Sequence, residues 1–219
     1  MKTRIVCSAF ALALAALPVA AQAQISIGPM AGVSFFTFSG SDANIYGTDL
    51  GANVSKGYRV GFVGGGFAEF ELGKVFAIEP QVLYVQKGAK YDVDITGGGP
   101  SGNATLKLDY IQIPVLFKAE YREAGRSYAP SLFVGPAIAF KTSCKISASA
   151  DGTSASEDCG TDAVNSTDFS LIFGIGFELS RFVLQARYDL GLTNVPQDSG
   201  VDIKNGGFAI TLGYGFALK

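Results

Sequence analysis

DFSLIFGIGFEL, residues 168–179, alternates bulky apolar side chains with small or polar ones. One face would carry Phe169, Leu171, Phe173, Ile175, Phe177 and Leu179, and the other Asp168, Ser170, Ile172, Gly174, Gly176 and Glu178. On a helix these apolar residues would spread around the whole circumference, whereas on a strand they share one side. The period of two therefore predicts a β-strand with one strongly apolar face.

The same pattern recurs along the chain and predicts eight strands. The closing segment, GFAITLGYGFAL at 207–218, alternates as clearly as 168–179. Six further segments fit less cleanly: 26–38, 58–71, 75–88, 107–121, 131–143 and 181–193. Each exceeds the usual strand of about 5–6 residues and reaches the roughly 9–11 residues that a tilted strand needs to cross a bilayer.

Prolines are the least typical feature of these predicted strands. Pro29, Pro80, Pro114 and Pro136 all fall within them. Proline removes a ladder hydrogen bond and is normally confined to edges and strand starts.

The connections between the predicted strands alternate in length. Gly73-Lys74 and Ser180-Arg181 are tight turns, and 122–128 is a short loop. The intervening connections, 39–57, 89–106, 144–166 and 194–204, are long and polar. Bacterial outer-membrane barrels have short periplasmic turns, long extracellular loops and an even number of strands. We therefore predict an all-β fold, a closed eight-stranded antiparallel up-and-down transmembrane β-barrel with its long loops outside the cell.

Composition favours a membrane barrel over a soluble one. The chain is 48% apolar and contains 28 glycines, but only 16% of its residues are charged. A soluble barrel or sandwich, such as a lipocalin-like binder, would turn its large apolar residues inward and cover its outside with charge. Here the face opposite the apolar one mixes glycine and alanine with a few charges, as in a narrow lumen filled by side chains.

The first 23 residues read as a cleaved signal peptide. Lys2 and Arg4 precede an apolar run, and Ala21-Gln22-Ala23 supplies a small-residue cleavage site. We expect residues 24–219 to form the barrel domain, with 15 basic against 19 acidic residues and a net charge of −4. No later stretch approaches the length of a membrane-spanning helix, and a mildly acidic chain without a basic cluster argues against nucleic acid.

The absence of histidine restricts the chemistry. It removes Ser–His and Cys–His nucleophilic pairs, histidine bases and most zinc or copper sites. The triplets Gly64-Gly65-Gly66 and Gly97-Gly98-Gly99 lack the lysine and hydroxyl residue of a phosphate-binding loop. We therefore expect no enzyme activity, no catalytic residues, no cofactor and no metal.

Several stretches resemble the PorT-like outer-membrane β-barrel family of Bacteroidota and related bacteria. They are GFVGGGFAEFEL (61–72), IEPQVLYVQKGAK (78–90), LDYIQIPVLFKAEY (108–121), LFVGPAIAF (132–140), QARYDLGLTNV (185–195) and GGFAITLGYGFALK (206–219). The Gln86-Lys87-Gly88 element beside Tyr84 and the YIQIP element are the most distinctive. The resemblance implies an outer-membrane location and an eight-stranded barrel. It implies no single function, because most members have no known role and a few assist secretion.

Two cysteines remain after the signal peptide is removed. Cys144 and Cys159 lie in or beside one predicted loop, and the exported setting is oxidising. We expect them to form a disulfide. Closing a loop of roughly 15 residues stabilises by about 3 kcal/mol in the chain-entropy model.

A second prediction concerns charges inside the barrel. Counted from the short-turn side, five inward positions fall within the first residues of their strands: Glu69, Glu79, Lys118, Glu178 and Arg187. Buried charges are costly unless they pair. We therefore expect Lys118 and Arg187 to bridge the three glutamates and to plug the barrel.

Three roles fit such a barrel. The first is a structural or surface-interaction protein, an adhesin or secretion accessory, whose partners are outer-membrane lipids and a surface or secretion-machinery protein. The second is a narrow, porin-like pore, although eight strands enclose an interior that side chains nearly fill. The third is a soluble periplasmic lipocalin-like binder of apolar ligands.

Overall fold

The computed structural model describes residues 24–43, 52–95, 102–122, 127–150, 153–160, 163–197 and 200–218. The expected signal peptide, 1–23, lies outside the described residues. The described strands are β1 (Ile25–Ser39), β2 (Ala52–Leu72), β3 (Phe76–Ile95), β4 (Gly102–Glu120), β5 (Tyr128–Ala150), β6 (Thr153–Asp158), β7 (Thr167–Leu179), β8 (Phe182–Asn194), β9 (Lys204–Tyr214) and β10 (Phe216–Leu218).

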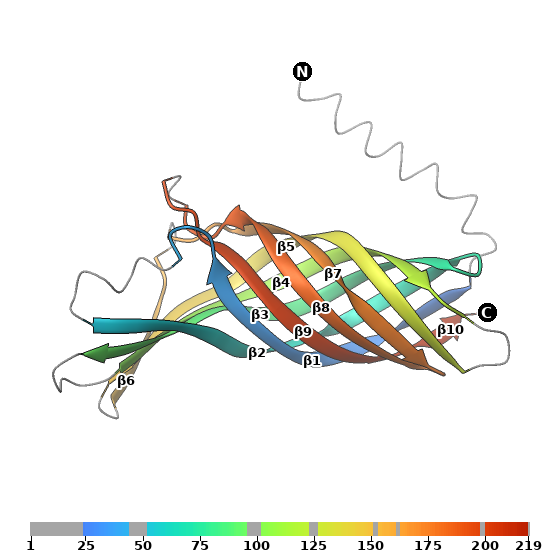
Figure 1. The fold of residues 1–219 in the computed structure, drawn as a ribbon, viewed down its shortest axis with the longest axis horizontal. Coiled ribbons are helices and arrows are strands. Elements are labelled where there is room, and N and C mark those ends of the chain that lie inside the picture. Colours follow the sequence, from blue (N-terminus) through green and yellow to red (C-terminus); the bar gives the residue numbers. More distant parts are fainter. Residues whose placement is uncertain are drawn as a thin grey trace, which may run out of the picture.

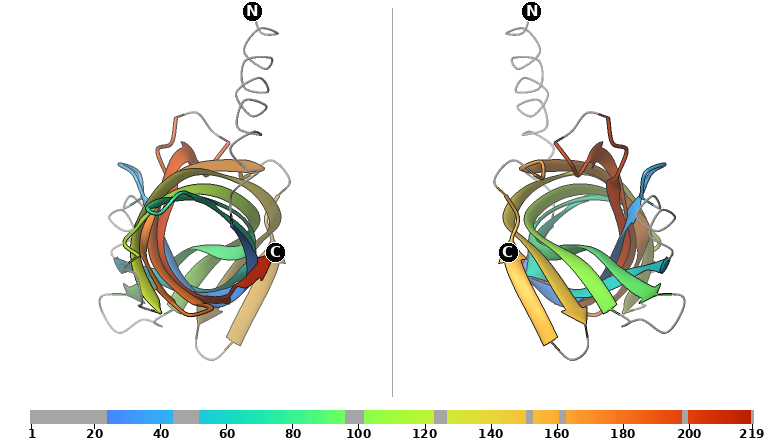
Figure 2. Two further views of the ribbon diagram at one scale, coloured as in Figure 1. Left: turned by 90° about the vertical axis from the view of Figure 1, so that its right-hand side faces the viewer. Right: turned by 90° about the vertical axis from the view of Figure 1, so that its left-hand side faces the viewer.

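The strands close into a ring, as predicted (Figures 1 and 2). The order β1-β2-β3-β4-β5-β7-β8-β9 is antiparallel throughout, and β1 pairs with β9 and β10 to complete the circle. β9 and β10 are one strand interrupted at Gly215, where the Gly215 N–H donates to Arg181 O instead. The ring thus has eight strands, with β9 and β10 counted as one. Its closure pairs the backbone N–H and C=O groups that lipid could not solvate.

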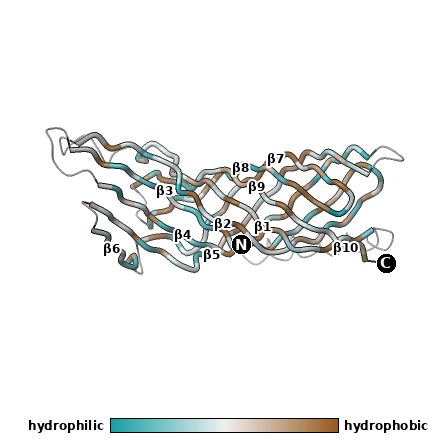
Figure 3. The backbone as a smooth tube through the Cα atoms, turned by 90° about the horizontal axis from the view of Figure 1, so that it is seen from below, coloured by the Kyte–Doolittle hydropathy of each residue, from teal (hydrophilic) through white to brown (hydrophobic). Residues whose placement is uncertain are grey.

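Large apolar side chains cover the outside of the barrel, where Figure 3 shows hydrophobic residues spread along its strands. In β7 the residues from Phe169 to Leu179 alternate as the sequence predicts: Phe173 and Ile175 are 45% and 59% exposed, whereas Ile172 is fully buried. An apolar surface of this extent requires an apolar surrounding. The alternative of a soluble lipocalin-like binder is therefore wrong. Within the described residues, no helix is long and apolar enough to cross a membrane.

The tight turns lie at one end of the barrel, which we call the turn end. Gly73 and Ser180 both have positive φ, 87° and 58°, in the β2–β3 and β7–β8 turns. Glycine adopts this conformation without steric cost. The opposite end, where the longer connections lie, is called the loop end.

The four prolines lie within strands, as predicted: Pro29 in β1, Pro80 in β3, Pro114 in β4 and Pro136 in β5. The register is the same on both sides of each proline, although two ladder pairs are missing beside Pro80, Pro114 and Pro136. The barrel therefore accommodates the lost ladder bonds.

Four strands run well past their predicted ends. The segments 39–57, 89–106 and 144–166 were predicted as loops, but they contain strand residues 52–57, 89–95, 102–106, 144–150 and 153–158. Together these form a five-stranded extension of one wall, β2-β3-β4-β5-β6, that stands beyond the ring at the loop end (Figure 1). We call this extension the projecting sheet. Hydropathy missed most of it because water meets both faces of its outer part, β6 and the end of β5, so nothing forces an apolar alternation there. At its base Tyr91, Leu106 and Cys144 pack against a buried apolar cluster.

A disulfide joins Cys144 of β5 to Cys159, with an S–S distance of 2.01 Å. It lies at the base of the β5–β6 hairpin, where Cys159 N–H also donates to Cys144 O at 3.1 Å. A two-stranded hairpin alone is only marginally stable in water. The bridge therefore holds β6 against β5.

We predict that this bridge can be opened from outside the cell without unfolding the barrel. A maleimide–polyethylene glycol too large to cross the outer membrane should leave the protein on intact cells unmodified, but modify both cysteines after mild reduction. The mass shift on a denaturing gel measures this.

The control is Lys74→Cys in a Cys144→Ser, Cys159→Ser background, which should react only after the membrane is permeabilised. Modification before reduction would contradict the disulfide. Modification of the Lys74→Cys variant on intact cells would reverse the orientation.

Candidate functional site

A buried lysine lies among glutamates in the lumen near the turn end. Lys118 Nζ, from β4, is 3.0 Å from Glu79 Oε2, 3.0 Å from Glu120 Oε1 and 3.2 Å from Glu178 Oε1. It also pairs with Glu69 Oε2. The side chains of Lys118 and Glu79 are 1% and 0% exposed. The ammonium group therefore ties together strands β2, β3, β4 and β7.

Arg122, just after β4, closes the mouth beneath this lysine. Its Nη2 is 2.7 Å from Glu120 Oε2, 3.1 Å from Glu178 Oε2, 3.2 Å from Glu71 Oε1 and 3.4 Å from Glu69 Oε1. Partial burial alone would lower the pKa of the guanidinium, but the facing carboxylates, Glu120 first, raise it above its ordinary value. A cavity of about 100 Å³ opens beside it.

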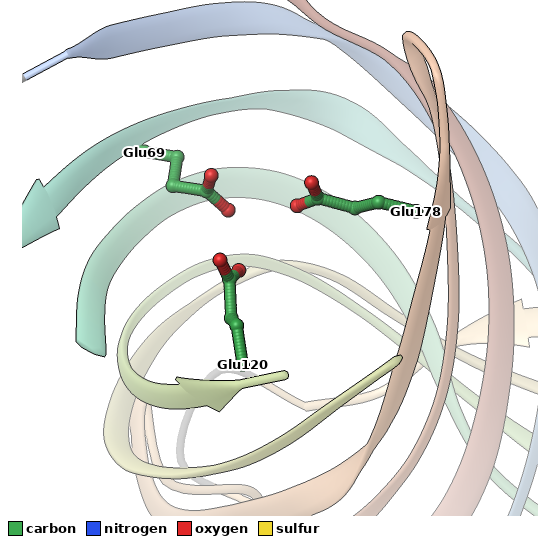
Figure 4. Close-up of side chains that lie close together, drawn as sticks. All are labelled: Glu69, Glu120 and Glu178. Atoms are coloured by element: carbon green, nitrogen blue, oxygen red, sulfur yellow. The ribbon is translucent and has the colours of Figure 1, made fainter. Parts of the chain in front are cut away.

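These seven residues make up what we call the turn-end cluster: Lys118, Arg122, Glu69, Glu71, Glu79, Glu120 and Glu178. The five carboxylates exceed the two cations, so the formal charge is −3. Figure 4 shows the carboxylates of Glu69, Glu120 and Glu178 pointing toward one another, with oxygens within 4.8 Å. Such oxygens suit a hard cation, but the Lys118 ammonium already occupies their common centre.

The structure brings together four of the five sequence-predicted lumen residues: Glu69, Glu79, Lys118 and Glu178. The prediction that Arg187 bridges the glutamates is wrong. Arg187 is buried in the lumen, but its Nη1 donates to Gln81 Oε1 at 2.7 Å. Glu178 is paired across the sheet with Val183, so Arg187 lies four residues higher, or about 13 Å along the strand.

Glu120 and Arg122 take the place expected for Arg187. Sequence reasoning missed them, although the period of two puts residues 118, 120 and 122 on one face. Arg122, however, lies just past the predicted strand end at 121, in a segment predicted as a short loop. The two residues supply four of the ion pairs around Glu69, Glu71, Glu178 and Lys118.

Glutamines connect this cluster to the middle of the lumen. Gln81 Nε2 donates to Glu79 Oε1 at 2.5 Å and to Gln185 Oε1 at 3.1 Å. Gln185 Nε2 donates to the same Glu79 oxygen at 2.7 Å. Arg187 extends this hydrogen-bond network toward the loop end by donating to Gln81 Oε1. A continuous polar network thus rises from the turn end.

A second lysine, Lys87 of β3, forms the loop-end cluster with Asp168, Asp189, Gln112 and Asn205. Lys87 is fully buried, and its Nζ is 3.2 Å from Asp168 Oδ2 and 3.2 Å from Asp189 Oδ2. Gln112 Nε2 donates to Asp189 at 2.6 Å, and Asn205 Nδ2 donates to Asp168 at 3.0 Å.

Two of the sequence elements quoted above, Gln86-Lys87-Gly88 and YIQIP, meet at this cluster. Lys87 belongs to the Gln86-Lys87-Gly88 element, and Tyr110 and Gln112 belong to YIQIP. Tyr110 is 1% exposed, and its ring centroid lies 5.5 Å from Lys87 Nζ. Gly88 has a φ of 121°, and a β-carbon there would meet Leu106 O at 2.0 Å. Packing of the lumen therefore accounts for Lys87, Gly88, Tyr110 and Gln112 of these elements, whereas Gln86 lines the outer wall.

Apolar side chains fill the space around the two clusters. One group contains Met30, Phe36, Val63, Phe67, Leu83, Val85, Val183 and Ala209, and another contains Leu116, Phe133, Ala137 and Ile172. The ring seen end-on in Figure 2 is therefore occupied rather than open. Buried, mutually paired charges of this kind crosslink the strands from which they come.

A family model described as "Outer membrane protein beta-barrel domain" matches residues 20–197. Comparison with curated protein sequences gave no match.

Three solved structures align with most of the chain. Ail of Yersinia pestis, in complex with the heparin analogue sucrose octasulfate, is 15% identical, with 88% of this chain and 99% of that chain covered and a TM-score of 0.41. OprG of Pseudomonas aeruginosa is 12% identical, with 90% and 97% covered and a TM-score of 0.43. Neisserial surface protein A is 12% identical, with 88% and 97% covered and a TM-score of 0.39.

We predict that Lys118→Ala lowers the free energy of unfolding by about 3–5 kcal/mol, because it leaves buried carboxylates without their cation. Urea unfolding of the protein refolded in lipid measures this. The deficit should be smaller at about pH 5 than at about pH 8, since protonated carboxyls cost less to bury.

Lys74→Ala, in the exposed β2–β3 turn, is the matched control and should unfold like the wild type. Equal unfolding midpoints for the two variants at both pH values would show that the cluster does not hold the barrel together.

Proposed function

Since this chain belongs to the outer membrane protein β-barrel domain family and lies in the bacterial outer membrane, we propose that it is a surface-interaction protein. Its projecting sheet, at the loop end, is the binding element and faces outside the cell. The partner is a protein that supplies an extended strand. The observation that carries this proposal is the free, disulfide-held edge of β6.

The pairing between β5 and β6 determines which groups face outward along that edge. Cys159 N–H donates to Cys144 O, so this pair is hydrogen-bonded. Hydrogen-bonded and non-bonded pairs alternate along an antiparallel ladder. Within the pairs Ala148–Ala155 and Ile146–Glu157 the two residues are therefore hydrogen-bonded to each other. Ser154 and Ser156 belong to the non-bonded pairs, so their backbone N–H and C=O groups point away from β5.

Nothing among the described residues covers these outward groups. β6 pairs only with β5, and all six of its residues are exposed. Natural edges are usually protected by charged side chains, proline or a bulge. β6 reads TSASED, so its charges lie only at Glu157 and Asp158 and its first four residues have none of these features. A preformed, unprotected edge suits β-strand addition, in which main-chain hydrogen bonds hold the incoming segment.

A pore is the weaker alternative. Conduction needs a continuous path, but the lumen is crossed by both lysine clusters and by apolar side chains between them. Lys87 and Tyr110, for example, are 0% and 1% exposed. A non-conducting barrel also fits a non-enzymatic role, in which the barrel serves as a rigid anchor.

We further propose that the chain is PorT-like and acts as a secretion accessory. The support is the resemblance over residues 61–72, 78–90 and 108–121, together with the packing role of its two most distinctive elements. A strand-binding edge at the surface would allow such a protein to hold an exported chain while it folds.

The test compares Ser156→Pro with Ser156→Ala. Both variants lose the hydroxyl contact to Ser147, which spans 3.1 Å. Only proline removes the outward N–H, and an edge position tolerates it. A photo-reactive residue placed at Ser154 in the native bacterium should crosslink a discrete partner in the Ser156→Ala protein and lose that product in the Ser156→Pro protein.

Equal crosslinking in the two variants would contradict strand addition at β6. Planar-bilayer recordings address the pore separately: the wild type should give no defined conductance. Regular conductance steps that change in Lys87→Ala would assign the protein to transport instead.

A further inference from the structure

A groove of about 620 Å³ crosses strands β2 to β5 on the outer wall, at the base of the projecting sheet. Four of its lining residues are cations: Arg59, Lys90, Lys107 and Lys145. Only one carboxylate, Asp109, lines it. This groove lies outside the lumen and is not part of the β6 edge.

The single carboxylate is already engaged. Asp109 Oδ1 lies 3.0 Å from Arg59 Nη2, and Tyr84 OH donates to Asp109 Oδ2 at 2.8 Å. Arg59 also donates to the backbone oxygens of Lys87 and Leu108. Arg59 and Asp109 thus form a fixed, neutral wall of the groove. Lys90 is paired with Asp92 at 2.8 Å, so the lysines left uncompensated by this wall are Lys107 and Lys145.

Two of those lysines face each other directly. Lys107 of β4 and Lys145 of β5 are cross-strand partners in the ladder. Like charges in directly opposed positions destabilise a sheet. Among the described residues no carboxylate lies within ion-pair distance of Lys107, and Lys145 has only a distant partner, Asp158 Oδ1 at 3.9 Å, with both side chains more than half exposed.

The surroundings of the groove are those of a membrane interface. Tyr58 and Val60 line it and are 53% and 66% exposed. Phe62, the next outward residue of β2 toward the turn end, is 49% exposed and begins the apolar wall. Tyrosine at such a boundary is typical of the aromatic girdles of membrane proteins. The cations therefore lie at the height where lipid headgroups meet the barrel.

We propose that this groove binds the phosphate groups of a phosphorylated glycolipid of the outer leaflet, between Lys107 and Lys145. A phosphate placed between these ammonium groups turns an unfavourable pair into two charge-assisted contacts. Tyr58 and Val60 then contact the upper part of the acyl chains. The inference uses the orientation given under Proposed function but not the β6 edge.

The experiment measures lipid retained by the refolded protein in detergent, by native mass spectrometry. The probes are diphosphoryl lipid A, monophosphoryl lipid A and phosphatidylglycerol. The wild type should retain diphosphoryl lipid A in preference to the other two. Lys107→Gln with Lys145→Gln should reduce that retention by about tenfold or more, given the usual contribution of each interfacial cation.

The matched control is Lys74→Gln with Lys204→Gln, which removes the same charge from the β2–β3 turn and from β9 and should retain lipid A like the wild type. Urea unfolding checks the fold. The Lys107, Lys145 variant should be at least as stable as the wild type without lipid, because a like-charge pair has been removed.

Three outcomes would overturn the proposal: equal retention by both double variants, equal retention of phosphatidylglycerol and lipid A, or complete displacement of lipid A by millimolar inorganic phosphate. The last would identify a site for the free ion. Ser156→Pro should leave lipid A retention unchanged, so failure here and failure of the β6 edge are separable.

Discussion

The Lys118 ammonium, buried among four glutamates, is the interaction on which the turn end of the barrel depends. The four carboxylates come from β2, β3, β4 and β7, so the lysine adds side-chain crosslinks to the backbone ladder and the apolar packing. Taking such charges out of water is expensive, and the arrangement is stable only while every partner is present. The same contacts that crosslink the strands also close the lumen. Anchoring and closure therefore have one physical origin.

Lys87 repeats this solution near the loop end, between Asp168 and Asp189. The two aspartates there exceed the single lysine by one charge, whereas the carboxylates around Lys118 and Arg122 exceed their cations by three. Between them the lumen is packed like the core of a soluble protein, while the outside is apolar. The proposed binding surfaces, the projecting sheet and the lysines at its base, both lie outside this packed interior.

Much of this architecture could be predicted from hydropathy with a period of two. Alternation identified the eight strands of the ring and the tight turns at 73–74 and 180–181. It also predicted that the side chains of Glu69, Glu79 and Glu178 point into the lumen. The alternation pattern failed to identify strands that have no buried face. In TSASED both faces meet water, so pairing continues with no apolar residue to reveal it.

Alternation also predicts whether a side chain points into or out of the barrel, but not its position along the barrel axis. Strands in a barrel are tilted and staggered, so equal distances along different strands do not bring residues together. Arg187 was correctly placed inside, yet the register of β7 and β8 lifts it four residues above Glu178. Arg122 was overlooked for the opposite reason, because it lies just past the end of its strand and still reaches into the lumen.

The most direct measurement is solid-state nuclear magnetic resonance of the isotope-labelled protein in lipid bilayers, detecting contacts between lysine Nζ and glutamate carboxyl carbons. The account predicts that Lys118 Nζ shows short-range contacts with Glu79, Glu120 and Glu178 and exchanges its protons slowly with water. A Lys118 signal in rapid exchange, without contact to any carboxyl carbon, would contradict it.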